Sequence, residues 1–391
     1  MWRNQVMAMR EKSDCLPNVL HVINSFATNR LYVHLIGLLG THKVPQIIYS
    51  AVRTEKEARY RPDELGNIPI FSHLILKRPD VLFFRRKIRK IRDDILSHID
   101  LTDIELVHAH TLYSDGAVGL KLKQEYGIPY IVAVRAGDVV AFARLRPDLA
   151  AIRNQVLREA QTVVFLSPTL HQQLNRHLDA QLQDVVSQKA VTIPNGIDSF
   201  YLENPPLTES ADDEATLKIL YIGKLLEQKN LISLVKAAKL LSRNRDVKLT
   251  IAGSGEMGPK IDKMTASGEY PFLNRLGEIR EKETLVKLYR SHDVFVMVPK
   301  QETFGLVYIE ALSQGLPVVF AANEGIAGYL EGKHFAEPVT DITDIREIAD
   351  AIEHIAQRKN KQLSEEGVRF TRKFDWNEII LQYLELYRKT C

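Results

Sequence analysis

Two glutamates in the second half of the chain are spaced so that one ligand could contact both. The segment QETFGLVYIEALSQGLPVVF (301–320) places Glu302 in a loop after a predicted strand and Glu310 inside the helix that begins near Gly305. A carboxylate accepts hydrogen bonds from hydroxyl groups, while the backbone N–H groups and the dipole at a helix start favour an anion. The segment therefore suits a ligand in which a diphosphate joins two polyhydroxylated rings. Acidic residues near a helix start also occur for the dipole alone, and that explanation stays open.

Basic and glycine-rich loops follow other predicted strands of the same half. Lys224 and Lys229 lie in YIGKLLEQKN, and IAGSGEM contains Gly253. Two lysines can neutralise a diphosphate, and a glycine lets the backbone approach a ligand closely. Solvated surface lysines and an ordinary turn are the simpler explanations of these loops.

The composition is that of an ordinary globular protein. The chain has 391 residues, 45% of them hydrophobic and 26% charged. It contains no apolar run of about 18 residues and begins without the apolar stretch of a secretory signal. Cys15 and Cys391 predict neither a disulfide framework nor a metal cluster. We therefore expect a cytoplasmic protein.

The pattern of strands and helices predicts two domains of parallel βαβ units. A polar connector at 199–218 separates the two halves. Residues 1–195 carry 26 Lys and Arg against 19 Asp and Glu, so the first half is the basic one. In such folds ligands bind at the carboxyl ends of the strands, and the cleft between two domains is the expected site. Predicted strands are 19–24, 45–52, 106–110, 129–135, 162–167, 217–223, 247–253, 293–298 and 317–322.

In order and spacing, the second-half motifs resemble the retaining glycosyltransferases of family 4. The motifs are PNGID, YIGKLLEQKN, IAGSGE, LGEI, LYRSHDVFVMVPKQETFGLVYIEALSQGLPVV and GIAGYL. The resemblance implies the α/β GT-B fold, with two Rossmann-like doubly wound domains facing a central cleft. The acceptor-side domain would be 1–195 together with a crossing-back helix in 370–391, and the donor domain would be 196–369.

The resemblance also implies roles for individual residues. Glu310 would bind the ribose hydroxyls of a nucleoside diphosphate sugar, and Glu302 the hydroxyls of the donor sugar. Lys224 and Lys229 would hold the diphosphate and stabilise the leaving group. The fold generally needs no metal ion or other cofactor. The remaining donor-site residues would be Phe304, Gly305, Leu306, Gly223, Gly253 and Gly277.

The first half departs from the family pattern. The usual Gly-Gly loop after the first strand is absent, and Asn29 stands in that region. Arg135 replaces a common histidine, while Asp138 is kept. Arginine cannot act as a base, so the acceptor proton would pass to the donor phosphate. Arg135 could instead clamp a phosphate or an anionic acceptor, or form a structural salt bridge.

His108 and His110 end a predicted strand, and we expect them to point to opposite faces. His110 is a candidate acceptor-side residue, although a structural role is the simpler explanation for both histidines.

A basic segment at 77–92 carries eight basic residues and one acid, Asp80, with apolar residues between them. It predicts either an amphipathic helix on an anionic membrane surface or a core helix with a solvated basic face. Nucleic-acid binding is not expected, because no motif for it accompanies the charge.

The expected function is transfer of a sugar from a nucleotide donor to a glycan or to a polyprenyl-diphosphate-linked acceptor. By family resemblance, the setting would be surface polysaccharide assembly, with the protein peripheral at the inner face of the membrane. Two alternatives stay open. One is a GT-B nucleotide-sugar epimerase or phosphorylase, and the other is a non-catalytic subunit that only binds a sugar nucleotide.

Overall fold

The computed structural model describes residues 16–143, 145–206 and 216–390. Both cysteines and part of the predicted connector, 207–215, lie outside these residues. The chain forms two compact units, Met1–Pro194 together with Asn377–Cys391, and Asn195–Trp376.

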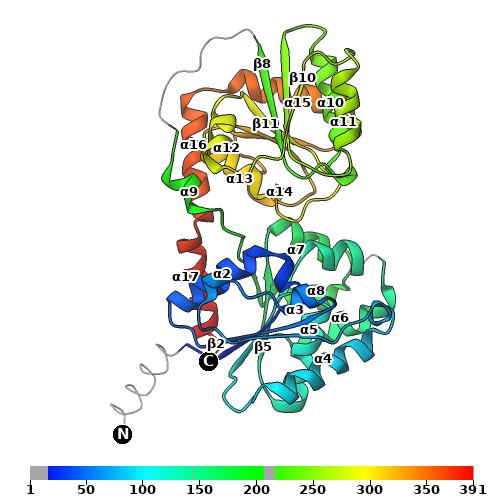
Figure 1. Cartoon of the computed structure of the whole chain (residues 1–391), viewed down its shortest axis with the longest axis vertical. Helices are drawn as coiled ribbons and strands as arrows, with labels where there is room; N and C mark the ends of the chain where they lie inside the picture. Colours follow the sequence, from blue (N-terminus) through cyan, green and yellow to red (C-terminus); the bar gives the residue numbers. More distant parts are fainter. Residues whose placement is uncertain (1–15, 144, 207–215, 391) are drawn as a thin grey trace. The chain divides into compact units, whose positions relative to one another are not determined.

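The first unit is built on a seven-stranded sheet in the order β3-β2-β1-β4-β5-β6-β7 (Figure 1). All of its strand pairs are parallel. Its strands are β1 Val19–Val22, β2 Gln46–Val52, β3 Ile70–Leu74, β4 Leu106–Ala109, β5 Tyr130–Val134, β6 Thr162–Phe165 and β7 Ala190–Thr192. Its helices are α2 Arg30–Thr41, α3 Glu55–Ala58, α4 Phe84–His98, α5 Ser114–Tyr126, α6 Ala150–Glu159, α7 Pro168–Asn175 and α8 Ala180–Ser187, joined by most of α17 Trp376–Arg388.

The second unit is built on a six-stranded parallel sheet in the order β10-β9-β8-β11-β12-β13. Its strands are β8 Leu217–Ile222, β9 Val247–Ala252, β10 Leu273–Gly277, β11 Val294–Met297, β12 Val318–Ala321 and β13 Ala336–Val339. Its helices are α9 Ser199–Glu203, α10 Leu231–Leu241, α11 Gly258–Ala266, α12 Lys282–Arg290, α13 Leu306–Ser313, α14 Ala327–Leu330, α15 Ile345–Arg358 and α16 Lys361–Thr371. Two parallel α/β sheets confirm the predicted fold class.

Helix α15 shows how an amphipathic segment of this chain packs on its sheet. In α15, Ile348, Ile352 and Ile355 are fully buried, and the Asp344 carboxylate caps the first turn by accepting from the N–H of Arg346 at 2.8 Å. Periodic apolar positions with a capped start explain why this segment is helical. Across the part of the chain that the structure describes, no helix has the length and apolarity to cross a membrane.

The chain leaves and re-enters the first unit through two neighbouring segments. The N–H of Ile197 donates to the carbonyl of Phe374 at 3.0 Å, beside the bridge between Ile197 and Asp375. Gly196 lies so close to the Trp376 ring that an added Cβ would come within 2.6 Å of it. The chain then returns to the first unit from Asn377, where the Tyr387 hydroxyl lies 2.7 Å from Nδ1 of His108.

Candidate functional site

The predicted donor residues gather where the second sheet reverses its strand order. β8 and β11 are neighbours in this sheet although they are distant in the sequence. Lys224 and Lys229 follow the carboxyl end of β8, and Glu302 follows that of β11. Ligands of doubly wound folds bind at such a switch point, so the topology itself places these three residues at a candidate site.

Lys229 and Glu302 form a partly buried ion pair. Nζ of Lys229 lies 2.7 Å from Oε2 of Glu302, and the two side chains are only 15% and 12% exposed. The other carboxylate oxygen accepts the N–H of Thr303 at 2.8 Å. A carboxylate has about four acceptor positions, so Glu302 is fixed in place and keeps capacity for a ligand hydroxyl.

Glu324 is a residue of this site that the sequence analysis did not identify. It follows β12, and its carboxylate accepts the backbone N–H of Glu302 at 3.0 Å. Burial raises the pKa of Glu324, and the neighbouring carboxylate of Glu302 adds to this effect. Three strand ends therefore contribute to one charged cluster.

Two glycines let the chain fold closely around Glu302. An added Cβ at Gly325 would lie 2.8 Å from Cγ of Glu302, and one at Gly305 would lie 2.6 Å from the Tyr308 ring. Gly305 also has a φ of 90° immediately before α13, a conformation that favours glycine. Leu306 is the first residue of α13, so the chain at Gly305 and Leu306 lies at the helix start as predicted. The Phe304 side chain is buried and meets the Tyr329 ring edge-on, which makes it a core residue.

Three predicted glycines end neighbouring strands. Gly253 donates its N–H to the carbonyl of Gly277 at 2.6 Å, and Gly223 donates to Ala252 at 3.0 Å. They follow or end β9, β10 and β8, and of these strands β8 borders the switch point. The backbone here is packed so closely that only glycine fits at Gly253, because its added Cβ would lie 1.9 Å from the Gly223 carbonyl oxygen.

Gly253→Ala is therefore expected to destabilise the second unit by about 3 kcal/mol or more, through a backbone clash that no side-chain rotation relieves. Chemical unfolding would measure this loss. Gly268→Ala is a suitable control, because its φ is also positive but an added Cβ meets nothing within 4 Å. An equal effect of the two substitutions would contradict the packing argument.

Lys224 is exposed, and no ion pair to its ammonium group is found within the described ranges. The residue itself is held in place, because its carbonyl accepts the Tyr221 hydroxyl at 3.0 Å. A fixed position with an uncompensated charge suits binding of an anion.

Glu310 lies one turn inside α13 and is partly buried. Its carboxylate accepts the hydroxyl of Tyr289, on α12, at 2.9 Å. Burial raises the pKa of Glu310 to about 7, although the hydrogen bond from Tyr289 favours the charged form. A carboxylate in such a position becomes more stable when a ligand supplies further hydrogen-bond donors.

The predicted acceptor-side residues lie in the first unit. Asp138 is buried and accepts the N–H groups of Leu112 and Arg135 at 3.0 and 2.8 Å, so it joins the loops after β4 and β5. Burial raises the pKa of Asp138 to about 6. Asn29 caps α2, accepting the N–H of Leu31 at 3.1 Å. Both side chains therefore have structural partners.

Arg135 makes no ion pair with any carboxylate that the structure describes. Its Nε donates to the carbonyl of His110 at 3.2 Å, and its guanidinium lies 5.6 Å from the centre of the Tyr32 ring. The structural salt bridge considered for Arg135 is thus not formed among the described residues. The alternative of an anion clamp stays a prediction.

The expectation that His108 and His110 point to opposite faces is wrong. Their rings stack with centroids 3.9 Å apart, because residues two apart along a strand share a face. His21, which the sequence analysis did not identify, completes the group with its Nδ1 3.0 Å from Nε2 of His110. All three are fully buried. This burial agrees with the structural role that was the simpler explanation for His110.

Acid is expected to weaken this histidine group. Burial lowers the pKa of His21 to about 3 and holds those of His108 and His110 well below their usual value. Since an unfolded histidine titrates near 6.5, the unfolded chain binds more protons below that pH. The stability of the first unit is therefore complete above pH 6.5 and is lost as the pH falls toward 3, by about 1.4 kcal/mol per histidine at pH 5.5.

Thermal unfolding between pH 7.5 and 5 would test this expectation. His21→Gln should flatten the pH dependence, while His42→Gln, at an exposed position after α2, should leave it unchanged. Identical slopes for the two variants would show that the buried group is not responsible.

Two groups of described residues offer three side chains each to a metal ion, with ligand atoms within 4.8 Å of one another. In the buried group His21, His108 and His110, the rings of His108 and His110 are stacked and nearly parallel, at 23°. The nitrogen lone pairs of two stacked rings lie in separate planes, so they cannot both point at one ion. In the other group, His73 lies 2.6 Å from Asp94, which also accepts the Tyr49 hydroxyl at 2.7 Å. Hydrogen bonds therefore explain this second group, which includes His98.

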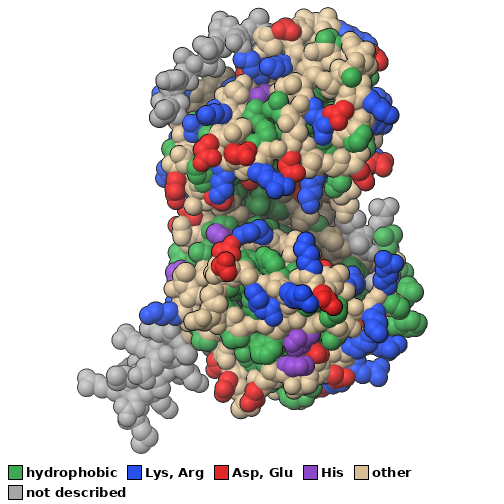
Figure 2. All heavy atoms as spheres, in the orientation of Figure 1, with side chains coloured by type: hydrophobic (Ala, Val, Ile, Leu, Met, Phe, Trp, Pro, Cys, Tyr) green, Lys and Arg blue, Asp and Glu red, His purple; other side chains and the backbone are tan. Residues whose placement is uncertain are grey.

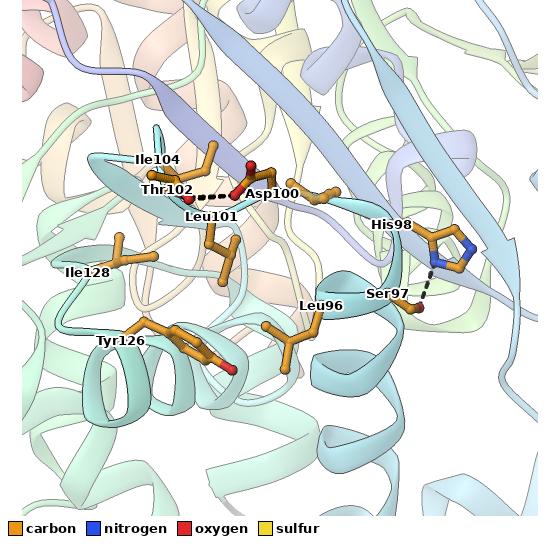
Figure 3. A pocket seen from close by; sticks show the side chains of 10 residues that line it. Leu96, Ser97, His98, Asp100, Leu101, Thr102, Ile104, Tyr126 and Ile128 are labelled. Atoms are coloured by element: carbon orange, nitrogen blue, oxygen red, sulfur yellow. Dashed lines mark hydrogen bonds between the residues drawn. The ribbon is translucent and has the colours of Figure 1, made fainter.

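A hollow of about 760 Å³, lined in part by His98, lies away from the predicted site residues (Figure 3). Leu96, Leu101, Tyr126 and Ile128 surround it, beside a hydrogen bond from Thr102 to Asp100. The hollow lies at the end of α4 and before β4 and β5, at the amino ends of the strands. It is thus at the wrong edge of the sheet for a ligand site of this fold.

A buried polar group stands at the switch point of the first sheet, between β1 and β4. Nδ2 of Asn24 donates to Oδ1 of Asp115 at 2.6 Å, and Nζ of Lys87 donates to Oγ of Ser114 at 2.5 Å. Burial raises the pKa of Asp115 to about 7, against the effect of the Lys87 charge. The sequence signal was a polar residue at the end of a predicted strand and another at a helix start.

Family models match both halves of the chain. Glycosyltransferase Family 4 matches residues 20–199, and Glycosyl transferases group 1 matches residues 208–369. The chain belongs to this glycosyltransferase family. Among relatives of this glycosyltransferase, the alpha-monoglucosyldiacylglycerol synthase of Acholeplasma laidlawii is 23% identical over 274 residues, which are 64% of this chain and 65% of that protein.

Solved structures share the GT-B fold of this glycosyltransferase. Sucrose-phosphate synthase from Thermosynechococcus elongatus aligns with a TM-score of 0.72 and 19% identity, over 96% of this chain and 99% of the other. HepE from Anabaena, in complex with UDP and glucose, aligns with a TM-score of 0.65 and 15% identity, over 95% and 99%. The shared fold confirms the predicted architecture of each unit.

Proposed function

We propose that this glycosyltransferase transfers a sugar, with retention of configuration, from a nucleoside diphosphate sugar to a glycan or to a lipid-linked acceptor. The partly buried pair of Lys229 and Glu302 carries the proposal, because it fixes a cation and a hydroxyl acceptor at the strand ends. The family resemblance suggests surface polysaccharide assembly at the cytoplasmic side of a membrane as the setting.

In the proposed reaction, the bond from the sugar C1 to the diphosphate oxygen breaks, and a bond from C1 to the acceptor oxygen forms on the same face. The acceptor proton passes to the departing phosphate oxygen, because Arg135 cannot act as a base. Lys229 and Lys224 stabilise the charge on the leaving group. In this proposal they take the part that a metal ion plays elsewhere, so a chelator should leave the activity unchanged.

Glu310 and Glu302 contact the two ends of the donor. Glu310 accepts hydrogen bonds from the ribose, and Glu302 accepts them from the hydroxyls of the transferred sugar. A uridine nucleotide is the first donor to test, since the HepE structure contains UDP and glucose. Of the two acceptor classes we favour the lipid-linked one, because the Acholeplasma relative is named as the synthase of a glycolipid.

Thermal unfolding in the presence of UDP, GDP, ADP or CMP tests the donor site. A ligand that binds only the folded state raises the melting temperature by mass action. We expect one nucleoside diphosphate to raise it in the wild type and to have a much smaller effect on Glu310→Ala. A shift that is equally large in the variant would contradict the role given to Glu310, and no shift with any nucleotide would count against the donor site.

A further inference from the structure

The eight basic residues of the segment 77–92 fall into two classes. Three of them are used inside the first unit. Lys87 is buried against Ser114, Lys90 lies 2.9 Å from Asp80, and Arg92 lies 2.7 Å from Asp93. The other five are exposed: Lys77, Arg78, Arg85, Arg86 and Arg89.

The four exposed arginines have no ion-pair partner among the residues that the structure describes. No ion pair joins them to a carboxylate, whereas the exposed Arg59 and Arg280 each have one. Asp80, the one acid of the segment, already binds Lys90 and the N–H of Lys77. Arg86 lies near enough to Asp80 to lower the pKa of that carboxyl, but Asp80 is already paired with Lys90. The arginines therefore present positive charge in excess, and the family function described above does not use it.

The apolar face of α4 is not available to a membrane, which corrects one of the two predictions for this segment. Phe84, Ile88, Ile91 and Ile95 are all buried in the first unit. The amphipathic pattern of the helix is thus explained by the core, as the second prediction held.

Two large apolar side chains directly before α4 are nevertheless exposed. Leu82 is 74% exposed and Phe83 is 59% exposed, among the highest values for large apolar residues here. The turn that presents them is hydrogen-bonded, since the N–H groups of both donate to the carbonyl of Pro79 at 3.0 and 3.2 Å. Asp80 fixes the turn to α4 through Lys90. Leu82 and Phe83 are thus displayed by an ordered turn.

The exposed apolar pair of this turn is flanked by exposed basic residues, which lie before it and in the first turns of α4. Figure 2 shows Lys and Arg side chains gathered beside exposed hydrophobic ones along an edge of the first unit. The combination matches the two parts of an anionic bilayer, in which head groups attract arginine and the interface accepts leucine and phenylalanine. Nucleic acid would bind the basic residues through its phosphates, but it would not require the exposed side chains of Leu82 and Phe83.

We propose that Leu82 and Phe83, together with Arg78, Arg85, Arg86 and Arg89, form a docking surface for a bilayer that contains anionic lipid. We call these six residues the docking turn. Its purpose, delivery of the protein to a lipid-linked acceptor, rests on the proposed function. Binding to the bilayer itself requires neither donor nor turnover.

The test is sedimentation of the full chain with vesicles of phosphatidylcholine alone, or with about one third phosphatidylglycerol. We expect binding only to the anionic vesicles, weakened as salt is raised from about 0.1 M, where the Debye length is about 10 Å. Reversal of the four arginines to glutamate should lower the partition coefficient at least about 100-fold. Leu82→Ser with Phe83→Ser should lower it about 10-fold without any change of charge.

The matched control reverses four exposed basic residues elsewhere in the first unit, which also have no ion pair among the described contacts: Lys43, Lys121, Arg158 and Arg176. It changes the net charge equally and should lower binding by less than about threefold if docking is local. Equal loss in the control would overturn the docking turn in favour of net charge. Wild type that ignores anionic vesicles, or binds RNA more tightly with no effect of the serine changes, would overturn it as well.

The nucleotide thermal shift separates this proposal from the proposed function. Every variant should keep the wild-type melting temperature and its shift with nucleotide, because the substituted residues are exposed and lie in the other unit. Vesicle binding without a nucleotide shift would leave the docking turn standing and count against the donor site.

Discussion

Lys229→Ala is expected to lower kcat for sugar transfer at least about 100-fold, the cost of removing one group that stabilises charge in a transition state. The ammonium group lies 2.7 Å from Glu302, so the ion pair holds it at the ends of the strands. Its removal also leaves a partly buried carboxylate without its partner. Initial rates of nucleoside diphosphate release would measure the effect.

Lys300→Ala is the matched control for this substitution. Lys300 is also in the second unit, but its side chain is 52% exposed and its Nζ is 3.9 Å from Glu227. The control should keep kcat within about twofold, since an exposed ion pair contributes little. A folded Lys229→Ala protein with normal kcat would contradict the assignment, and so would equal losses in the two variants.

Glu310→Gln is expected to stabilise the ligand-free protein while weakening nucleotide binding. Burial raises the pKa of Glu310 to about 7, against about 4.3 in an unfolded chain. At pH 8 the folded protein therefore holds a costly buried carboxylate, and an uncharged amide of the same shape removes that cost. We expect a gain of about 1 to 3 kcal/mol in the free energy of unfolding at pH 8.

The sign of the pH dependence follows from the raised pKa. Between about pH 4.3 and 7 the folded state binds the Glu310 proton more tightly than the unfolded chain, so this residue costs stability as the pH rises through that window. The gain in Glu310→Gln should accordingly vanish below pH 4.5 and be largest above pH 7. Glu283→Gln, at an exposed position on α12, is the control. It should change neither the free energy of unfolding nor its dependence on pH.

Nucleotide affinity gives the second half of this prediction. An amide accepts hydrogen bonds from ribose less strongly than a carboxylate, so Kd for the nucleoside diphosphate should rise about 10-fold in Glu310→Gln. Titration calorimetry at pH 8 measures it. A variant that is more stable yet binds equally well would show that Glu310 is a structural acid beside Tyr289.

The interior of each sheet could be predicted from the sequence, and its edges could not. The nine strands identified by their apolar runs are the interior strands of the two sheets, where burial on both faces requires continuous apolar residues. The four others described, β3, β7, β10 and β13, are edge strands with one solvated side. Two of these edge strands, LNRLG in β10 and AEPV in β13, show why they were not predicted. Their polar residues and proline interrupt the continuous apolar run by which the other strands were identified.

The candidate site likewise contains residues that could be predicted from the sequence and residues that could not. Glu302 and Lys229 were identified from loops that follow interior strands, and the structure brings the two side chains together. Glu324 was missed because its contact with Glu302 depends on the pairing of β11 with β12, which no local spacing reveals. His21 was missed for a similar reason, since it meets His110 only through the pairing of β1 with β4.

The most direct test of the central claim is to incubate the protein with a ¹³C-labelled uridine diphosphate hexose and follow the anomeric carbon by NMR, with Lys229→Ala as the comparison. The proposed function predicts that the donor signal disappears with release of UDP, that the first product keeps the configuration of the donor, and that the variant does neither at a measurable rate. If the wild type raises its melting temperature with UDP but never consumes a uridine, guanosine or adenosine diphosphate sugar at stoichiometric enzyme, the protein binds sugar nucleotides without transferring sugar, and the account is contradicted.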